Sequence, residues 1–115
     1  YVASLQASDP EAQVVVLGDF NDFQFSNTIE TLTGTGESQI LFDRLETLDD
    51  AAVYTYNFEG NSQVLDQLFV TENLRAGTEI DIVHANADFR DGASDHDPIV
   101  ARLDLSGRDP IAGNF

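Results

Sequence analysis

Several residue types are missing from this chain of 115 residues, and each absence removes a class of function. The sequence holds no Cys, which excludes a disulfide framework, a thiolate zinc site and a Cys nucleophile. No apolar run approaches the roughly 20 residues that a membrane-spanning helix needs. A Gly-rich phosphate loop, a Ser nucleophile elbow and the Gly pattern of dinucleotide-binding folds are also absent. Any chemistry must therefore come from other polar side chains.

Basic residues are also scarce. Five Arg and no Lys stand against 21 acidic residues, which gives a formal net charge of -16. Because phosphate contacts supply most of the affinity for nucleic acids, this balance argues against tight DNA binding by the chain alone. Three explanations remain open: a basic surface on a further segment, local neutralisation by divalent cations, or an acidic surface that suits high ionic strength.

The remaining composition is that of a folded domain. Hydrophobic residues make up 42% of the chain, and its length suits one compact unit. The chain begins with Tyr1 rather than Met, and no signal peptide is recognisable, so we expect it to be part of a longer protein. We place the domain at residues 1–106 and a tail or linker at residues 107–115.

Apolar periodicity predicts an α/β fold with a mixed sheet and short flanking helices. The clearest strand is 13–18 (QVVVLG), a β-branched run typical of a strand that is buried on both faces. We expect strands 53–58 and 64–71 to form a hairpin around a turn at Gly60-Asn61. The other expected elements are helices over 1–8, 26–32 and 41–48, strands over 79–85 and 99–105, and loops over 33–37 and 88–97.

Two polar clusters lie at the ends of predicted strands: one follows the strand 13–18, and the other precedes the strand 99–105. The first is Gly18–Asp22 (GDFND) and the second is Ser94–Pro98 (SDHDP). Each cluster taken alone is compatible with a simple turn, in which Asp and Asn side chains bond their own backbone. Their occurrence together, in this order and with Ile-Val-Ala-Arg after the second, indicates a functional site where loops converge at strand ends.

With these motifs the chain resembles the second half of a deoxyribonuclease I-like domain, of the endonuclease/exonuclease/phosphatase superfamily, up to Leu105. Val14–Asp22 resembles an apolar strand that leads into Gly-Asp-Phe-Asn, and Val64–Thr71 a middle strand that carries an Asp. Ser94–Ala101 resembles the terminal Ser-Asp-His-Pro-Val segment, while Tyr54–Asp66 is most similar to large secreted bacterial nucleases. The resemblance implies half of a four-layered α/β sandwich and an extracellular location.

The resemblance also implies metal-dependent phosphodiester hydrolysis, with DNA as the first substrate to consider. Asp19 would orient or deprotonate the attacking water, and Asn21 would hydrogen-bond the scissile phosphate and stabilise its developing charge. Asp95 would hold a divalent cation, Mg²⁺ first, with Mn²⁺ or Ca²⁺ as alternatives. His96 would contact the phosphate and assist proton transfer, while Asp66 would fix its tautomer.

The family's first half has no counterpart upstream of Asp19. The resemblance places the principal metal-binding Glu, an early Asn and a second His in that half, so it implies that the isolated chain is inactive. It also implies an exposed inner sheet face that includes part of Val14–Leu17. Since large exposed apolar faces favour association, we expect the missing half as a partner, and a homodimer or aggregates without it.

Two other functions remain open. A phosphatase or phospholipid phosphodiesterase of the same superfamily would share this core, because substrate choice depends on loops. A non-catalytic acidic half-domain could instead bind calcium or a protein partner. An EF-hand loop over Asp19–Glu30 is rejected, because Gln24 occupies the sixth position, where the turn requires Gly.

Further aromatic and histidine residues favour structural roles. His84 lies in a predicted apolar strand and is expected to be a satisfied sheet residue rather than a ligand. Tyr54, Tyr56 and Phe58 form a stripe for which core packing is the expected role. Stacking on nucleic-acid bases is the alternative for this stripe.

Overall fold

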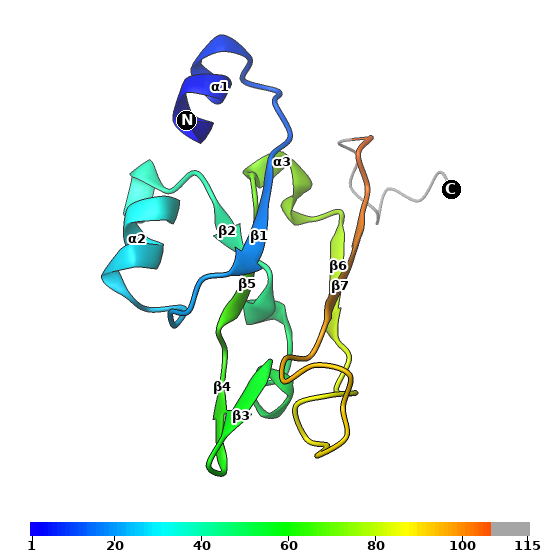
Figure 1. The fold of residues 1–115 in the computed structure, drawn as a ribbon. Helices are drawn as coiled ribbons and strands as arrows, with labels where there is room; N and C mark the ends of the chain where they lie inside the picture. The colour runs from blue at the N-terminus through cyan, green and yellow to red at the C-terminus, as the bar shows by residue number, and fades with distance from the viewer. Residues whose placement is uncertain (107–115) are drawn as a thin grey trace.

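A computed structural model describes residues 1–106, so the predicted tail or linker at 107–115 lies outside the described residues. The described residues form three small sheets, and the α-helices lie toward the top and the left of the view in Figure 1. The α-helices are α1 (Val2–Ser8), α2 (Asn27–Thr33) and α3 (Glu72–Arg75), and the 3-10 helices are Gly36–Ser38, Leu45–Thr47 and Asp50–Ala52. The strands are β1 (Val15–Asp19), β2 (Phe42–Asp43), β3 (Tyr56–Phe58), β4 (Asn61–Gln63), β5 (Asp66–Val70), β6 (Thr78–Ile82) and β7 (Ile99–Leu103).

The central sheet has the strand order β1-β5-β2, with β5 in the middle. β1 and β5 run antiparallel, and their register pairs Val15 with Val70 at one end and Asp19 with Asp66 at the other. The sheet thus ends, on one side, with two aspartates directly opposite each other. The hairpins β3–β4 and β6–β7 form the other two sheets.

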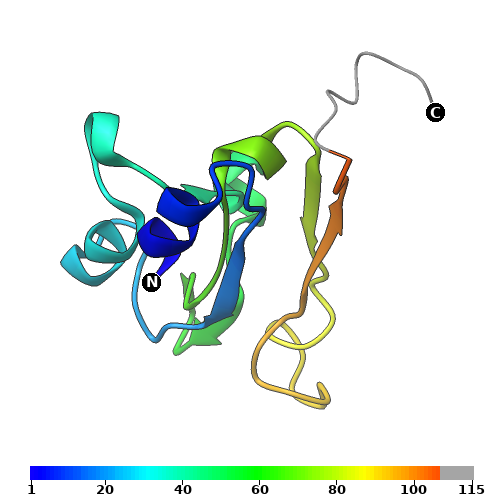
Figure 2. The same cartoon turned by 90° about the horizontal axis from the view of Figure 1, so that it is seen from above.

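Side chains on β5 alternate between two hydrophobic clusters, as the two-residue period of a strand requires. Phe69 points to one face and packs with Ile29 of α2. Leu68 and Val70 point to the other face and pack with Leu74 of α3 and with residues of β6 and β7. Seen from above, α2 and the β6–β7 hairpin accordingly lie on opposite sides of the central sheet (Figure 2).

The α/β class predicted from the sequence is confirmed. Within residues 1–106 every strand pair is antiparallel, where the sequence indicated a mixed sheet. In the same part of the chain, no helix is both long and apolar enough to span a lipid bilayer.

The helix predicted over 41–48 is wrong. Phe42 and Asp43 instead form β2 and pair with β5, and the Arg44 amide donates to the Leu68 carbonyl at 3.0 Å. The Asp43 carboxylate accepts the Leu45 amide at 2.8 Å. Such a local side-chain bond offers the backbone an alternative to a helix, so a 3-10 turn follows. Leu41 and Leu45 are both buried, but Leu41 directly precedes β2 and Leu45 begins a 3-10 helix, so they do not share an α-helix.

The predicted pairing of 53–58 with 64–71 is also wrong. β3 pairs with the short strand β4, in a register that sets Phe58 opposite Asn61. The two loop residues, Glu59 and Gly60, both have positive φ, at 49° and 83°. Positive φ at both positions is the type I′ geometry that joins strands through two residues. The following strand, β5, then enters the central sheet instead.

Candidate active site

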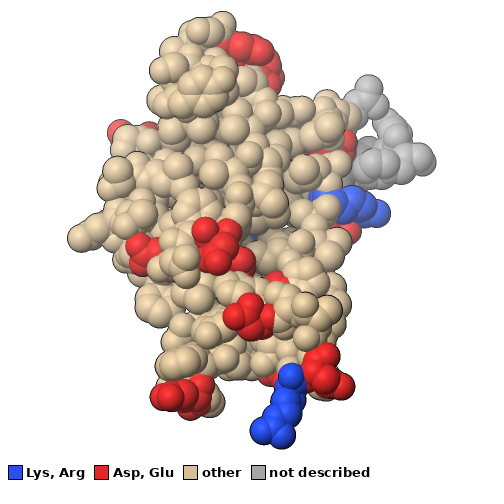
Figure 3. Space-filling view, in the orientation of Figure 1, with Lys and Arg blue, Asp and Glu red and all other residues tan. Residues whose placement is uncertain are grey.

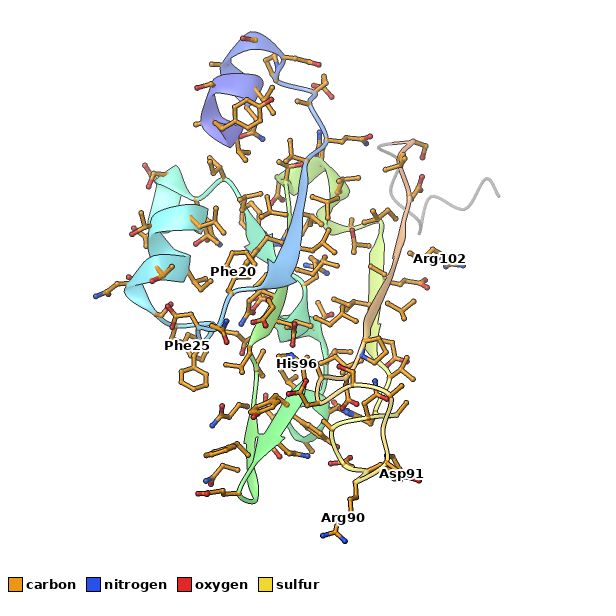
Figure 4. The ribbon with its side chains drawn as sticks, viewed as in Figure 1. Phe20, Phe25, Arg90, Asp91, His96 and Arg102 are labelled. Carbon is orange, nitrogen blue, oxygen red and sulfur yellow. The ribbon has the colours of Figure 1, made fainter. Side chains whose placement is uncertain are left out.

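Asp19, Asp66 and His96 converge at the end of the central sheet. The β1–β5 register brings the two aspartates together, and His96 reaches them from the loop before β7. His96 Nδ1 lies 2.6 Å from Asp66 Oδ2, and one ligand atom from each of the three residues lies within 4.8 Å of the others. Figure 4 shows His96 between the central sheet and the β6–β7 side of the molecule. A cleft of about 160 Å³ adjoins the two aspartates.

The last residue of β1, Asp19, and Asn21 in the loop after it are both exposed to solvent. Phe20, between them, turns inward and packs edge-on against Phe69, with ring centroids 5.8 Å apart. The Phe20 amide donates to the Leu65 carbonyl at 2.9 Å. Asn21 has a φ of 50°, and its amide donates to Asp19 Oδ1 at 2.9 Å. Asn tolerates this left-handed conformation better than most residues, so the loop sequence suits its shape.

Gln67 joins this loop to the start of β5, a role that sequence reasoning missed. Its side chain is buried, and Nε2 donates to the Asp22 carbonyl at 3.1 Å and to the Val64 carbonyl at 3.3 Å. Within the described residues Gln67 Oε1 has no hydrogen-bond partner. An amide that directly follows Asp66, before the apolar residues of the strand, is the sequence feature that could have revealed it.

Thr55 connects the segments that carry Asp66 and His96. Its buried hydroxyl accepts the Leu65 and Asp66 amides, both at 3.3 Å. Its carbonyl accepts the Asp97 amide at 2.7 Å. One residue therefore fixes the backbone on both sides of the His96–Asp66 hydrogen bond.

Asp97 is a buried carboxylate that holds the loop behind His96, and sequence reasoning assigned it no role. Oδ1 accepts the amides of Asn86 and Ala87, both at 2.8 Å, and Oδ2 lies 2.9 Å from His84 Nδ1. Burial works to raise the Asp97 pKa, but these hydrogen bonds outweigh it, so the pKa is lowered. The acid directly before Pro98 was the available clue.

His84 has a structural partner at each ring nitrogen, since Nε2 lies 3.0 Å from the Ala52 carbonyl. It therefore behaves as the satisfied residue that the sequence suggested, although it lies just beyond β6, which ends at Ile82, rather than in a strand.

The electrostatics of the cluster favour a charged imidazole at His96. The hydrogen bond that His96 donates to Asp66 raises the His96 pKa, partial burial works against this rise, and the negative charges of Asp66, Asp19 and Asp95 add to it. His96 Nε2 has no hydrogen-bond partner among the described residues, so it is free to donate to an anion.

The donor set fits a hard divalent cation only in part. Asp19 and Asp66 supply two carboxylates, which matches the one or two that usually hold Mg²⁺ together with substrate phosphate oxygens. His96 bonds Asp66 through Nδ1 and has a raised pKa, and the protonated imidazole has no lone pair to offer a cation, so it adds little to cation binding in that state. Asp95, the predicted ligand, is exposed and stands outside the converging group, and its role remains a prediction.

Comparison with known proteins agrees with this arrangement. A model of the endonuclease/exonuclease/phosphatase family matches residues 1–90, and the chain belongs to that family. Membership of this family supports a hydrolase of the phosphodiesterase, nuclease or phosphatase type in general. The match includes Asp19 and Asp66, whereas His96 lies beyond it. Neither the curated proteins nor the solved structures gave a significant match.

Proposed function

We propose that this chain supplies part of the active site of a metal-dependent phosphodiesterase, with DNA as its substrate. The observation that supports this proposal is the convergence of Asp19, Asp66 and His96 at one end of β1 and β5, beside a cleft. A phosphodiester is anionic and resists attack, so hydrolysis needs a water activated by a base and donors placed on the phosphate. In this cluster Asp19 can serve as the base and His96 as the hydrogen-bond donor, and the two side chains lie close together.

Asp19 is the residue proposed to act on the water. Its carboxylate is exposed, and Oδ1 accepts the Asn21 amide, which leaves Oδ2 to accept a proton from water. The Asn21 side chain stands on the same loop, where its amide would donate to a phosphate oxygen. Such a bond strengthens as negative charge grows on that oxygen in the transition state.

His96 and Asp66 are proposed to act as a pair on the phosphate. Asp66 accepts from Nδ1, which fixes the orientation of the ring and directs Nε2 outward. The raised pKa keeps the ring protonated to higher pH, so Nε2–H can donate to the phosphate or to the leaving oxygen. Asp66 thus positions His96, and His96 makes the contact.

A divalent cation, Mg²⁺ first and Mn²⁺ or Ca²⁺ otherwise, would be held by Asp19, Asp66 and the predicted ligand Asp95, completed by the first half of the domain. When bound, it supplies positive charge that stabilises the phosphate oxygens. It would also offset the acidity of a chain that has five Arg and no Lys, and the face drawn in Figure 3 shows few basic side chains. We further propose that the longer protein acts outside the cell, as the secreted nucleases that it resembles do.

A phosphatase or phospholipid phosphodiesterase is the second candidate, and the charge of -16 favours it. A small or neutral phosphoester suffers less repulsion from this surface than polymeric DNA does.

The test is plasmid cleavage by the protein that contains the complete domain, in Mg²⁺, Mn²⁺ and Ca²⁺. We expect Asp19→Ala and His96→Ala each to reduce the rate by about 10²-fold or more, the size of acid–base contributions. Asp81→Ala removes an exposed acid of β6 and is expected to leave the rate unchanged.

The isolated chain is assayed beside it and is expected to be inactive. Cleavage of small phosphomonoesters or phospholipids, without DNA cleavage, would favour the second candidate. Cleavage by the isolated chain that Asp19→Ala abolishes would show that the first half is dispensable.

A further inference from the structure

A row of aromatic rings leads away from His96. The Tyr56 ring lies beside the His96 ring, with centroids 5.0 Å apart and planes tilted by 38°. The Phe58 ring follows at 6.4 Å from Tyr56, nearly parallel to it at 10°. A backbone bridge between Tyr56 and His96 fixes the first step of this row. The rings therefore extend outward from the group proposed to contact the phosphate.

The β3–β4 hairpin holds these rings in place. Tyr56 and Phe58 are two residues apart on β3, so they share one face of the hairpin. Asn57, between them, points to the other face and donates to Asp88 Oδ1 at 2.6 Å, while its own Oδ1 accepts from Ser62 at 2.6 Å. The backbone that carries the rings is thus secured from the opposite side. Figure 1 shows the hairpin projecting beyond the lower end of β5.

Phe58 takes no part in the core. Its side chain is 51% exposed, and it belongs to neither hydrophobic cluster. Tyr54, two residues before Tyr56, differs: its ring stacks on His84 at 4.0 Å and its hydroxyl bonds Asp88. The aromatic stripe therefore divides into a structural tyrosine and an outward pair next to the site.

We propose that Tyr56 and Phe58 form a stacking platform for unpaired bases of a single-stranded nucleic acid whose scissile phosphate lies at His96. This proposal rests on the proposed function and specifies its substrate. Proteins that bind single-stranded nucleic acids without sequence preference use aromatic side chains on which successive bases stack, together with a positively charged groove for the backbone. Tyr56 and Phe58 would supply the stacking part of such a site. Duplex bases are already stacked on each other, so the platform selects unpaired strands.

The charge of the hairpin supports stacking rather than phosphate contacts. Glu59 is the one charged residue between Tyr54 and Val64. Without Lys or Arg there, neutralisation of the phosphate backbone contributes little on this side. Stacking depends on the base and not on its phosphate, so it can bind a strand to an acidic protein.

The test compares a single-stranded DNA oligonucleotide with an abasic oligonucleotide of the same length, which keeps the phosphates and removes the bases. Affinities are measured on the complete-domain protein without divalent cations, so that no cleavage occurs. We expect the base-bearing strand to bind about tenfold more tightly, as stacking of one base confers. Phe58→Ala and Phe58→Leu should both remove this preference, since Leu keeps the apolar bulk but not the flat ring.

Phe89→Ala is the matched control. Phe89 is 56% exposed, comparable to Phe58, and makes no ring contact within the described residues. Phe89→Ala should leave the preference for bases intact. Equal binding of the two oligonucleotides, or a preference that survives in both Phe58 variants, would overturn the platform. Binding to phosphatidylcholine vesicles that depends on Phe58, without a preference for bases, would overturn it in favour of a lipid.

Hydrolysis assays separate the two proposals. If the oligonucleotide is cut with a KM that Phe58→Ala does not change, the phosphodiesterase function stands and the platform is wrong. If bases are preferred in binding but neither strand is cut with any of the three cations, the proposed function fails.

Discussion

His84 and His96 are the two histidines of the chain, and each bonds a carboxylate through Nδ1. Their side chains are equally accessible, at 26% and 25%. They differ at Nε2, which reaches the Ala52 carbonyl in His84 and has no described partner in His96. This difference makes His84 a structural residue and leaves His96 able to bind a ligand. The sequence favoured these two roles, but the contact with Ala52 that explains them spans 32 residues and could not be predicted from local sequence.

The first prediction concerns the His96–Asp66 pair. Asp66 stabilises the imidazolium through its hydrogen bond and charge, so Asp66→Asn should lower the His96 pKa. NMR titration of the ring signals in metal-free buffer measures this, and the His84 signals serve as an internal control. A His96 pKa that does not fall in Asp66→Asn would show that the hydrogen bond is not formed in solution.

The sign of the stability effect follows from the same shift. The folded-state pKa of His96 lies above its unfolded value, so the pair contributes its full stabilisation below the unfolded pKa. That contribution is lost as the pH rises through the folded-state pKa.

The second prediction concerns Asp97. Asp97→Ala would leave the amides of Asn86 and Ala87 and the His84 ring without the carboxylate that accepts from them. The Asp97 side chain is buried, so water cannot easily replace it as the acceptor. Removing one partner of such a buried arrangement should lower the free energy of unfolding by about 3 kcal/mol. Urea unfolding at neutral pH measures it, with the exposed neighbour Asp95→Ala expected to cost less than about 0.5 kcal/mol.

The pH dependence provides a second measurement on Asp97. Its folded-state pKa is lowered, so its contribution is present above the unfolded pKa and is lost as the pH falls through the folded value. The difference in stability between the native protein and Asp97→Ala should therefore shrink in acid. A constant difference would mean that the variant acts through packing alone.

The residues of the site could be predicted from sequence only where a motif names them. Asp19 and His96 stand in recognisable motifs, and the β1–β5 pairing explains why Asp66 joins them. Gln67 and Thr55 were missed because their partners are set by tertiary packing. Gln67, for example, bonds the carbonyl of Asp22, 45 residues away.

Secondary structure was predicted well where one pattern dominated and poorly where two competed. The Ser26 cap of α2, whose hydroxyl accepts the Ile29 amide, appears as expected. The β-branched run does form a strand, β1, but the expected burial on both faces is wrong: β1 lies at the edge of its sheet, and its residues are half-buried or exposed. The 41–48 segment has apolar residues at helical spacing, but bonding to β5 overrides this pattern. For segments this short, tertiary hydrogen bonds decide the outcome, because isolated helical turns are marginal in water.

The third prediction tests the turn that ends α2. Gly34 has φ 79° and ψ 172°, a region that is essentially restricted to Gly, and an added Cβ would lie 2.5 Å from the Ser38 carbonyl oxygen. Gly34→Ala should therefore lower the free energy of unfolding by about 3 kcal/mol. Gly36 also has positive φ but open space around its Cβ position, so Gly36→Ala should cost about 1 kcal/mol. Equal losses in thermal or urea unfolding would contradict the role given to the Ser38 contact.

The surface of the molecule combines strong negative charge with an open apolar edge. β1 pairs only with β5 in the described sheet, so its other edge is unpaired there. Leu17, in the middle of this strand, is 66% exposed beside the cleft. Unpaired apolar edges are sites of association, which proteins usually block with charge or Pro. Here the net charge of -16 opposes contact between copies at long range.

The fourth prediction follows from the balance between these two effects. At about 0.01 M salt the Debye length is ~30 Å and repulsion between copies should keep the chain monomeric, whereas at 0.15 M it is ~8 Å and apolar contact can prevail. Sedimentation velocity should therefore show dimers or larger species that increase with salt. Leu17→Gln should suppress them, while Phe25→Gln, at an exposed ring outside β1 in the segment before α2, should not. A chain that stays monomeric at every salt concentration would show that the exposed edge of β1 does not mediate self-association. It would also show that charge repulsion is not what keeps the copies apart.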